Sequence, residues 1–258
     1  MSNEILCRLV DDKIFHIEFN RPEKLNAFTM EMFREFKKCM EEGDESPAKV
    51  FLISGKGRSF SAGADLNTLA NLENMDKESV YRILEEMYEA AAIVYNAEKP
   101  VITAVQGYAV GSGFGIALAS DILILSKDAI LRPGYMLLGL NPEFCVSLLL
   151  PHIIGFKNSF KILVMREDIH AEEAVKLGIA QYIVDKDELL DKAFEIAREI
   201  SELPSYAVLN TKKLLKKTLV YDCREIIRDE ARMQAENIAT QEHKKYITKY
   251  LEKFLKRK

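Results

Sequence analysis

The sequence has few cysteines, and none of them stand close together in the chain. They are Cys7, Cys39, Cys145 and Cys223, and no two of them form a CxxC pair. Zinc sites and redox motifs use such closely spaced pairs, and disulfide frameworks are typical of short secreted chains. We therefore expect reduced thiols in an intracellular protein, with no metal site.

Signals for a membrane or an export route are also missing. No apolar run approaches the roughly 18 residues that suggest a membrane span. Residues 1–4 contain neither a basic region nor an apolar core, so no signal peptide is predicted. Residues 256–258 are not the Ser-Lys-Leu peroxisomal signal. The expected location is the cytoplasm, and a net charge of -4 gives no support to nucleic-acid binding.

Common nucleotide and hydrolase motifs are absent as well. The glycine-rich stretch 107–115 is no dinucleotide fingerprint, because Ile116 stands where the third glycine is needed. Val110 and Phe114 replace the glycines of a GxSxG hydrolase elbow around Ser112. The sequence contains no GxxxxGK[ST] phosphate loop, and its histidines form no HExxH pair.

The pattern of apolar residues predicts an α/β protein with one large core. At 258 residues, 48% hydrophobic and 29% charged, the chain is long enough to bury such a core. The pattern predicts no strand after about residue 185. We therefore expect a parallel α/β core over residues 1–200 and a helical C-terminal region over 201–258. The predicted strands are 5–10, 14–19, 50–53, 101–105, 121–125, 129–131 and 179–184. The predicted helices are 30–42 (capped by Thr29), 76–96, 144–150, 157–165, 171–177, 188–202, 204–219 and 222–256.

Two turns rich in glycine and alanine follow predicted strands. One turn is 60–66 and the other is 107–115. Small side chains leave backbone N–H groups accessible, and the first turn of a helix favours an anion. Two such donors that converge on one oxygen form an oxyanion hole, where each is worth roughly 10²–10³ in rate. Two tight packing turns without a function would explain the same spacing.

Several ordered motifs together resemble the crotonase superfamily, the enoyl-CoA hydratases and isomerases. The resemblance covers nearly the whole chain. It implies a crotonase (ClpP-like) ββα spiral core with a helical C-terminal region that forms trimers, often paired into hexamers. The motifs are NRP and LNA within 20–27, FSAGADL at 60–66, KPVI at 99–102, GYAVGSG at 107–113, SDI at 120–122, AEEA at 171–174 and GIA at 178–180.

The resemblance also implies an acyl-CoA thioester as substrate, with no other cofactor. The thioester carbonyl of such a substrate develops enolate charge, which the backbone N–H groups of Ala62 and Ser112 would stabilise. Ser112 stands where many members have glycine, and its side chain is expected to narrow the pocket. The other expected substrate contacts are Leu25, Ala27, Gly63, Ala64, Asp65, Leu66 and Tyr135.

Departures from the family pattern point to the reaction. Hydratases of the family carry two glutamates that activate water, and Gly115 and Tyr135 occupy those positions. Glycine has no side chain, and tyrosine, with a pKa of about 10, is a poor base. Glu143 instead resembles the catalytic base in the Pro-Glu-x-Cys segment of peroxisomal-type Δ3,Δ2-enoyl-CoA isomerases. The resemblance thus implies conversion of 3-enoyl-CoA to trans-2-enoyl-CoA, with Glu143 as the single base and its pKa raised by apolar neighbours.

Other interpretations stay open at this point. An exposed acid near the start of a helix would also explain Glu143. The same fold could carry out other chemistry on an acyl thioester, such as hydration, decarboxylation or hydrolysis. It could also bind acyl-CoA without turnover.

Overall fold

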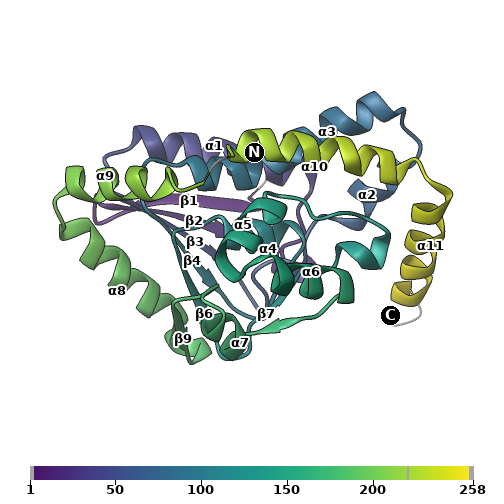
Figure 1. Ribbon diagram of the computed structural model, residues 1–258. Helices are drawn as coiled ribbons and strands as arrows, with labels where there is room; N and C mark the ends of the chain where they lie inside the picture. Colours follow the sequence, from purple (N-terminus) through teal and green to yellow (C-terminus); the bar gives the residue numbers. More distant parts are fainter. Residues whose placement is uncertain (1–2, 220, 256–258) are drawn as a thin grey trace.

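The computed structural model describes residues 3–219 and 221–255, and a six-stranded sheet lies at its centre (Figure 1). The first two strands form an antiparallel hairpin, and every later pairing in this sheet is parallel. The strand order is β1 (Ile5–Val10), β2 (Ile14–Phe19), β3 (Val50–Gly55), β4 (Val101–Val105), β6 (Ile122–Ser126) and β9 (Tyr182–Val184).

Both faces of the sheet are covered, which explains the continuous apolar runs in its central strands. Side chains alternate between the faces along β3. Leu52 packs in a cluster with Ala193 and Ile196 of α8 (Leu189–Glu202). Ile53 faces the opposite, larger cluster, together with Phe36 of α1 (Met30–Glu45). Alternate residues of one buried strand therefore serve two separate hydrophobic layers.

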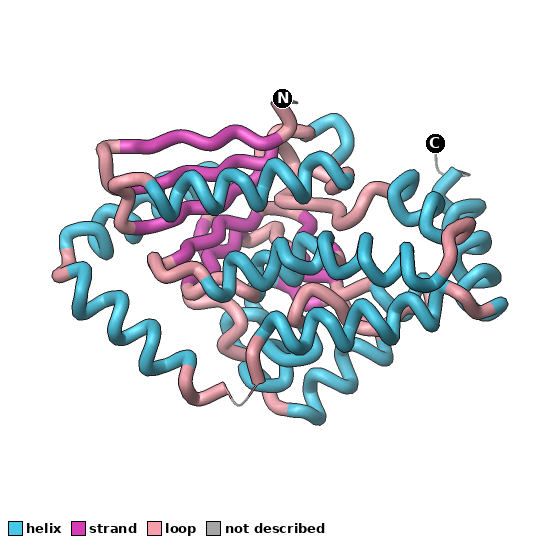
Figure 2. Tube along the Cα trace, turned by 90° about the horizontal axis from the view of Figure 1, so that it is seen from above, coloured by secondary structure: helices cyan, strands magenta, loops and turns pink. Residues whose placement is uncertain are grey.

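Helices form most of the larger layer and the periphery of the molecule. Figure 1 shows α8 and α9 at one end and α11 at the other, and the long α3 and α10 pack against each other across one face (Figures 1 and 2). None of the helices within 3–219 and 221–255 combines the length and the apolar character that crossing a bilayer requires. The remaining bounds are α1 (Met30–Glu45), α2 (Leu66–Leu72), α3 (Lys77–Asn96), α4 (Ser112–Leu118), α5 (Val146–Ile154), α6 (Phe156–Met165), α7 (Ala171–Lys176), α9 (Ser205–Lys216), α10 (Cys223–Ile238) and α11 (Gln241–Leu255), with short 3-10 turns η1 (Pro22–Lys24), η2 (Tyr135–Leu138) and η3 (Lys186–Glu188).

A second, three-stranded sheet was not predicted from the sequence. It consists of β5 (Tyr108–Val110), β7 (Ile130–Arg132) and β8 (Ile169–His170), in the order β5-β7-β8. Strand β5 lies inside the glycine-rich stretch, and its pairing with β7 fixes the direction in which the chain enters α4. This small sheet therefore positions the second of the two turns.

Two helical predictions also needed correction. Helix α2, capped by Asp65, begins where the sequence indicated only a turn. The single helix expected over 222–256 is two helices, α10 and α11, because the chain turns at Ala239 and Thr240. Residue 256 lies outside the described residues. The predicted cap of α1 is confirmed, since the Thr29 hydroxyl accepts from the Met32 N–H.

The expectation of reduced thiols is wrong for this structure. The structure contains two disulfides, Cys7–Cys39 and Cys145–Cys223, with Cα–Cα distances of 6.1 and 6.0 Å. These distances are ordinary for disulfides. The partners are 32 and 78 residues apart in the chain, so no local spacing could reveal the pairing.

Candidate active site

Main-chain hydrogen bonds hold the turn 60–66 against β5. The Ser61 N–H donates to the Tyr108 carbonyl at 3.0 Å, and the Val110 N–H donates to the Ser61 carbonyl at 2.9 Å. The two turns are in direct contact. A Cβ on Gly113 would lie 2.7 Å from the Ser61 Cβ, and one on Gly63 would lie 2.9 Å from the Val110 carbonyl oxygen. Only glycine allows the turns to approach this closely.

The structure contradicts the expected role of Ala62. Its N–H donates to the Leu25 carbonyl oxygen at 2.8 Å, so it is not free to bind an oxyanion. Leu25 has a left-handed backbone with φ of 53°, at the end of the short η1 turn. This conformation of the LNA loop brings the carbonyl against the turn 60–66, and the sequence did not predict it.

Two other N–H groups are free in the neighbourhood. Phe28 and Ala64 form an isolated parallel β-bridge: the Phe28 N–H donates to the Gly63 carbonyl, and the Phe28 carbonyl accepts from the Asp65 N–H, each at 2.8 Å. In such a bridge the Ala64 N–H is directed away from Phe28. Ser112 is the first residue of α4, where N–H groups have no partner within the helix. Across the described part of the chain, the N–H groups of Ala64 and Ser112 donate to no protein atom.

Glu143 lies beside the second of these donors. It is half-buried in the loop between η2 and α5. Its Oε2 accepts hydrogen bonds from the Tyr88 hydroxyl at 2.6 Å and from the Gln234 Nε2 at 3.1 Å. Its Oε1 lies 4.0 Å from the position of a Cβ on Gly111, the residue directly before Ser112. The carboxylate therefore reaches the glycine-rich turn with the oxygen that carries no donor.

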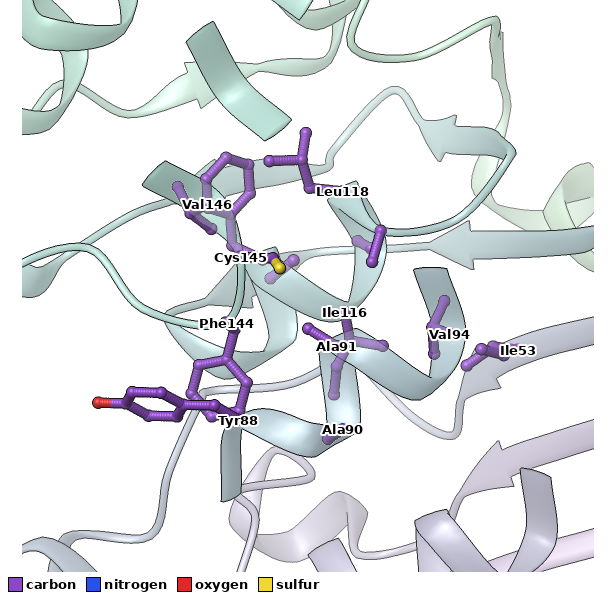
Figure 3. Packing of buried hydrophobic residues seen from close by; sticks show 14 of the residues in the cluster. Ile53, Tyr88, Ala90, Ala91, Val94, Ile116, Leu118, Phe144, Cys145 and Val146 are labelled. Atoms are coloured by element: carbon purple, nitrogen blue, oxygen red, sulfur yellow. The ribbon is translucent and has the colours of Figure 1, made fainter. Parts of the chain in front are cut away.

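The surroundings of Glu143 make it a base suited to neutral pH. Desolvation raises the pKa of Glu143 from 4.5 to about 7, although the hydrogen bonds from Tyr88 and Gln234 lower it in part. A general base works best when its pKa is close to the working pH. The ring of Phe144 supplies apolar cover, with ring centroids 4.7 Å from Tyr88 and 5.7 Å from Phe33. Figure 3 shows Phe144 against Tyr88, with the phenol oxygen directed away from the apolar cluster.

The two residues at the hydratase positions cannot activate a water molecule. A Cβ on Gly115 would lie only 2.3 Å from the Phe144 Cβ, so no larger side chain fits there without displacing the loop. The ring of Tyr135 is buried, and its hydroxyl donates to the Gly111 carbonyl at 3.2 Å. Desolvation, followed by the negative charge of Glu143, raises the pKa of Tyr135 well above 10. Among Gly115, Tyr135 and Glu143, only Glu143 has a side chain whose pKa lies near neutral pH.

The other expected contact residues lie in the same region, but some have structural roles. The Ala27 carbonyl accepts from Arg21 Nη1 at 2.9 Å, and the same nitrogen pairs with Asp65 Oδ2 at 2.9 Å. The Asp65 carboxylate also caps α2 by accepting from the Asn67 N–H, and Leu66 begins that helix. Arg21, in the NRP motif, thus ties the loop 20–28 to the turn 60–66.

Helix α10 contributes residues that the sequence analysis missed. Gln234 is fully buried, and its Oε1 accepts from the Asn141 N–H at 3.0 Å. Glu230 is also buried, and its carboxylate accepts from the N–H groups of Cys145 at 2.9 Å and Ser147 at 3.1 Å. The contacts of Cys145 with Glu230 and of Asn141 with Gln234 join positions 85 and 93 residues apart, so no local pattern could predict them.

The arrangement can remove a proton from a carbon next to a carbonyl. Two main-chain N–H groups without a protein acceptor offer a place for the carbonyl oxygen, and one carboxylate stands beside the Ser112 end of the glycine-rich turn. Among the residues that the structure describes, no three His, Cys, Asp or Glu side chains are grouped so as to hold a metal ion. The free N–H groups and the Glu143 carboxylate suit enolate chemistry supported by backbone donors.

Comparison with known proteins gives the family. The model of a family described as Enoyl-CoA hydratase/isomerase matches residues 10–257. The chain belongs to this enoyl-CoA hydratase/isomerase family, and the resemblance to the crotonase superfamily is confirmed.

Relatives with known names include both isomerases and hydratases. The chain is 30% identical to the peroxisomal Delta(3,5)-Delta(2,4)-dienoyl-CoA isomerase of Arabidopsis thaliana, covering 82% of this chain and 80% of the relative. It is also 30% identical to a crotonyl-CoA hydratase of Syntrophomonas wolfei, covering 98% and 97%. An enoyl-CoA hydratase/isomerase structure from Mycobacterium paratuberculosis is 27% identical, with a TM-score of 0.86 over 96% of this chain and 99% of that chain. Overall identity therefore does not choose between the two reactions.

Proposed function

We propose that the protein is a Δ3-Δ2-enoyl-CoA isomerase in which Glu143 is the single base. The observation that carries this proposal is the position of Glu143 Oε1 beside Gly111 and the free Ser112 N–H, with a carboxyl pKa of about 7. The closed position at Gly115 supports it further, because double-bond migration needs no water.

In the proposed mechanism the thioester oxygen of a 3-enoyl-CoA binds the N–H groups of Ala64 and Ser112. Glu143 takes the proton from C2, and the electron pair of the broken C–H bond spreads over the dienolate. The two N–H groups stabilise the negative charge on the oxygen. Glu143 then returns the proton to C4, which leaves the double bond between C2 and C3. Ala64 replaces Ala62 as the first donor, because the Ala62 N–H is occupied by Leu25.

A hydratase is the second candidate, favoured by the similarity to crotonyl-CoA hydratase. The test compares isomerisation of 3-hexenoyl-CoA with hydration of crotonyl-CoA, using one preparation and product separation by chromatography. The wild type should isomerise and show little hydration, and Glu143→Gln should lose at least a hundredfold in kcat, the upper part of the range for one acid–base group. Glu172→Gln, at an exposed position on α7, is the matched control. Equal isomerisation by the wild type and Glu143→Gln, or dominant hydration, would exclude the proposal.

The remaining expectations concern assembly and location. We propose a homotrimer or a dimer of trimers that associates through the helical region 201–258. Support comes from α9, which has no buried residue and exposes Tyr206, Leu214 and Leu215. Light scattering coupled to gel filtration measures the assembly. The cytoplasmic location stays a prediction, and the disulfides, which are more typical of oxidising compartments, argue against it.

A further inference from the structure

The two oxygens of Glu143 have unequal surroundings. Oε2 accepts from the Tyr88 hydroxyl and from the Gln234 amide. Oε1, among the residues described, accepts from none and faces Gly111. A carboxylate that rotated freely would present either oxygen to a substrate. The two donors, which come from α3 and α10, remove that freedom.

The direction of the Gln234 hydrogen bond follows from its neighbour. A glutamine amide can be placed in two ways, and its partners decide which end is the oxygen. The Asn141 N–H can only donate, and it lies 3.0 Å from the Gln234 Oε1. The Gln234 NH₂ group is therefore the end that points to Glu143. Because Gln234 is fully buried, no solvent competes for this contact.

We propose that Tyr88 and Gln234 are positioning residues that hold Oε2, so that Oε1 alone carries the proton from C2 to C4. This inference rests on the proposed isomerase function. The Oε1 lone pair forms an O–H bond as the C2–H bond breaks, and the same O–H bond breaks when C4 is protonated. A single fixed oxygen within reach of both C2 and C4 suits a proton transfer that starts on C2 and ends on C4.

Removing either donor should change the titration of Glu143 in a known direction. Both hydrogen bonds stabilise the charged carboxylate, so their loss raises its pKa further. The titratable groups that face Glu143 from the elements around it are Tyr88 on α3, Tyr135 on η2 and Glu230 on α10. None of these three is a cation that could replace the lost donor.

The decisive variant is Tyr88→Phe, which deletes one oxygen from a buried ring. We expect the acidic limb of the kcat–pH profile to move up by about one unit, the worth of one hydrogen bond to a charged group. At pH 7 kcat should fall roughly fivefold, because the ionised fraction of a carboxyl with a pKa of about 7 drops from about a half to about a tenth when that pKa rises by one unit. KM should change little, since the hydroxyl does not contact substrate in this scheme. Tyr95→Phe is the matched control, because Tyr95 lies half-buried on the same helix and stacks with Lys216 instead. Gln234→Met provides a second variant with the same expected direction.

A measurement without substrate separates this inference from the proposed function. Infrared difference titration follows the protonated carboxyl band of Glu143, identified by its absence in Glu143→Gln. Its midpoint should rise in Tyr88→Phe and stay unchanged in Tyr95→Phe. An unchanged midpoint and pH profile in Tyr88→Phe would overturn the positioning role. If the midpoint rises in Tyr88→Phe but the wild-type protein shows no isomerase activity, the proposed function is refuted and the hydrogen-bonding role of Tyr88 is kept.

Discussion

Gly115 tests the steric argument that favours the proposed isomerase over a hydratase. In Gly115→Ala the added Cβ would lie 2.3 Å from the Phe144 Cβ and 2.9 Å from the Phe144 carbonyl oxygen. Carbon atoms in ordinary contact lie about 3.5–4.0 Å apart. The loop that carries Glu143 must therefore move, or the end of α4 must shift.

The loss in the free energy of unfolding caused by Gly115→Ala can be worked from two opposing effects. Overpacking of this kind costs roughly 1–3 kcal/mol, and the severe overlap here indicates the upper end. Replacing glycine by alanine inside a helix returns about 1 kcal/mol. The free energy of unfolding should thus fall by about 2 kcal/mol, which lowers Tm by roughly 4–8 °C for a chain of this size. The proposed isomerase activity should fall more steeply than the stability, because Glu143 is adjacent to Phe144.

Calorimetry of single and double variants measures this effect. Phe144→Gly removes the opposing Cβ at a backbone position with φ of 57°, where glycine is unstrained. In that background Gly115→Ala should destabilise much less, because only the 2.9 Å approach to the backbone carbonyl oxygen of residue 144 remains. Gly115→Glu should gain no hydration of crotonyl-CoA. A Gly115→Ala protein with unchanged Tm, or a Gly115→Glu protein that hydrates crotonyl-CoA, would refute the reasoning.

Three further predictions follow from single contacts. Ser112→Pro removes the N–H at the first position of α4, where proline is tolerated, and places a ring where the buried Ser112 side chain was. The kcat should fall about 10²–10³-fold, whereas Ser112→Ala, which keeps the N–H, should stay near wild type in the same assay. Thiol titration in denaturant should detect no free cysteine before reduction, and titratable thiols in the unreduced protein would contradict this. In calorimetry the double variant Cys145→Ser, Cys223→Ser should lose up to about 4 kcal/mol of the free energy of unfolding, because this disulfide closes a loop of 78 residues. Because the pKa of Glu143 is raised, the folded chain binds more protons than the unfolded chain between pH 4.5 and about 7. The free energy of unfolding of the wild type should therefore fall as pH rises through this window, and Glu143→Gln should make that fall smaller.

Local periodicity was sufficient for most of the fold. Strand β2 and helix α1 were predicted with nearly their observed bounds, because each carries its own apolar pattern and end signals. Strand β5 carries no such signal, since its three residues lie between glycines and are ordered by β7 and by Ser61. Tertiary pairing therefore decided the structure of this stretch, on which sequence rules were silent.

The site shows the same division more sharply. Family resemblance placed Glu143 and Ser112 in the region where the structure has them. It failed at Ala62, because the freedom of an N–H group depends on which carbonyl lies opposite, and that carbonyl belongs to Leu25. Gln234 has no motif at all, and its role depends on the packing of α10 against α3.

Helix α10 has more than the assembly role that the sequence suggested for the C-terminal region. Three links join it to the loop around Glu143: Gln234 donates to the carboxylate, Glu230 accepts from the N–H of Cys145, and Cys223 is bonded to Cys145. That loop contains two consecutive non-glycine residues with positive φ, 57° and 62°. Such strain, about 1–3 kcal/mol per residue, persists only where surrounding contacts impose it. The strained backbone that directs Glu143 toward the glycine-rich turn is therefore held in place from a helix some 80–90 residues further along the chain.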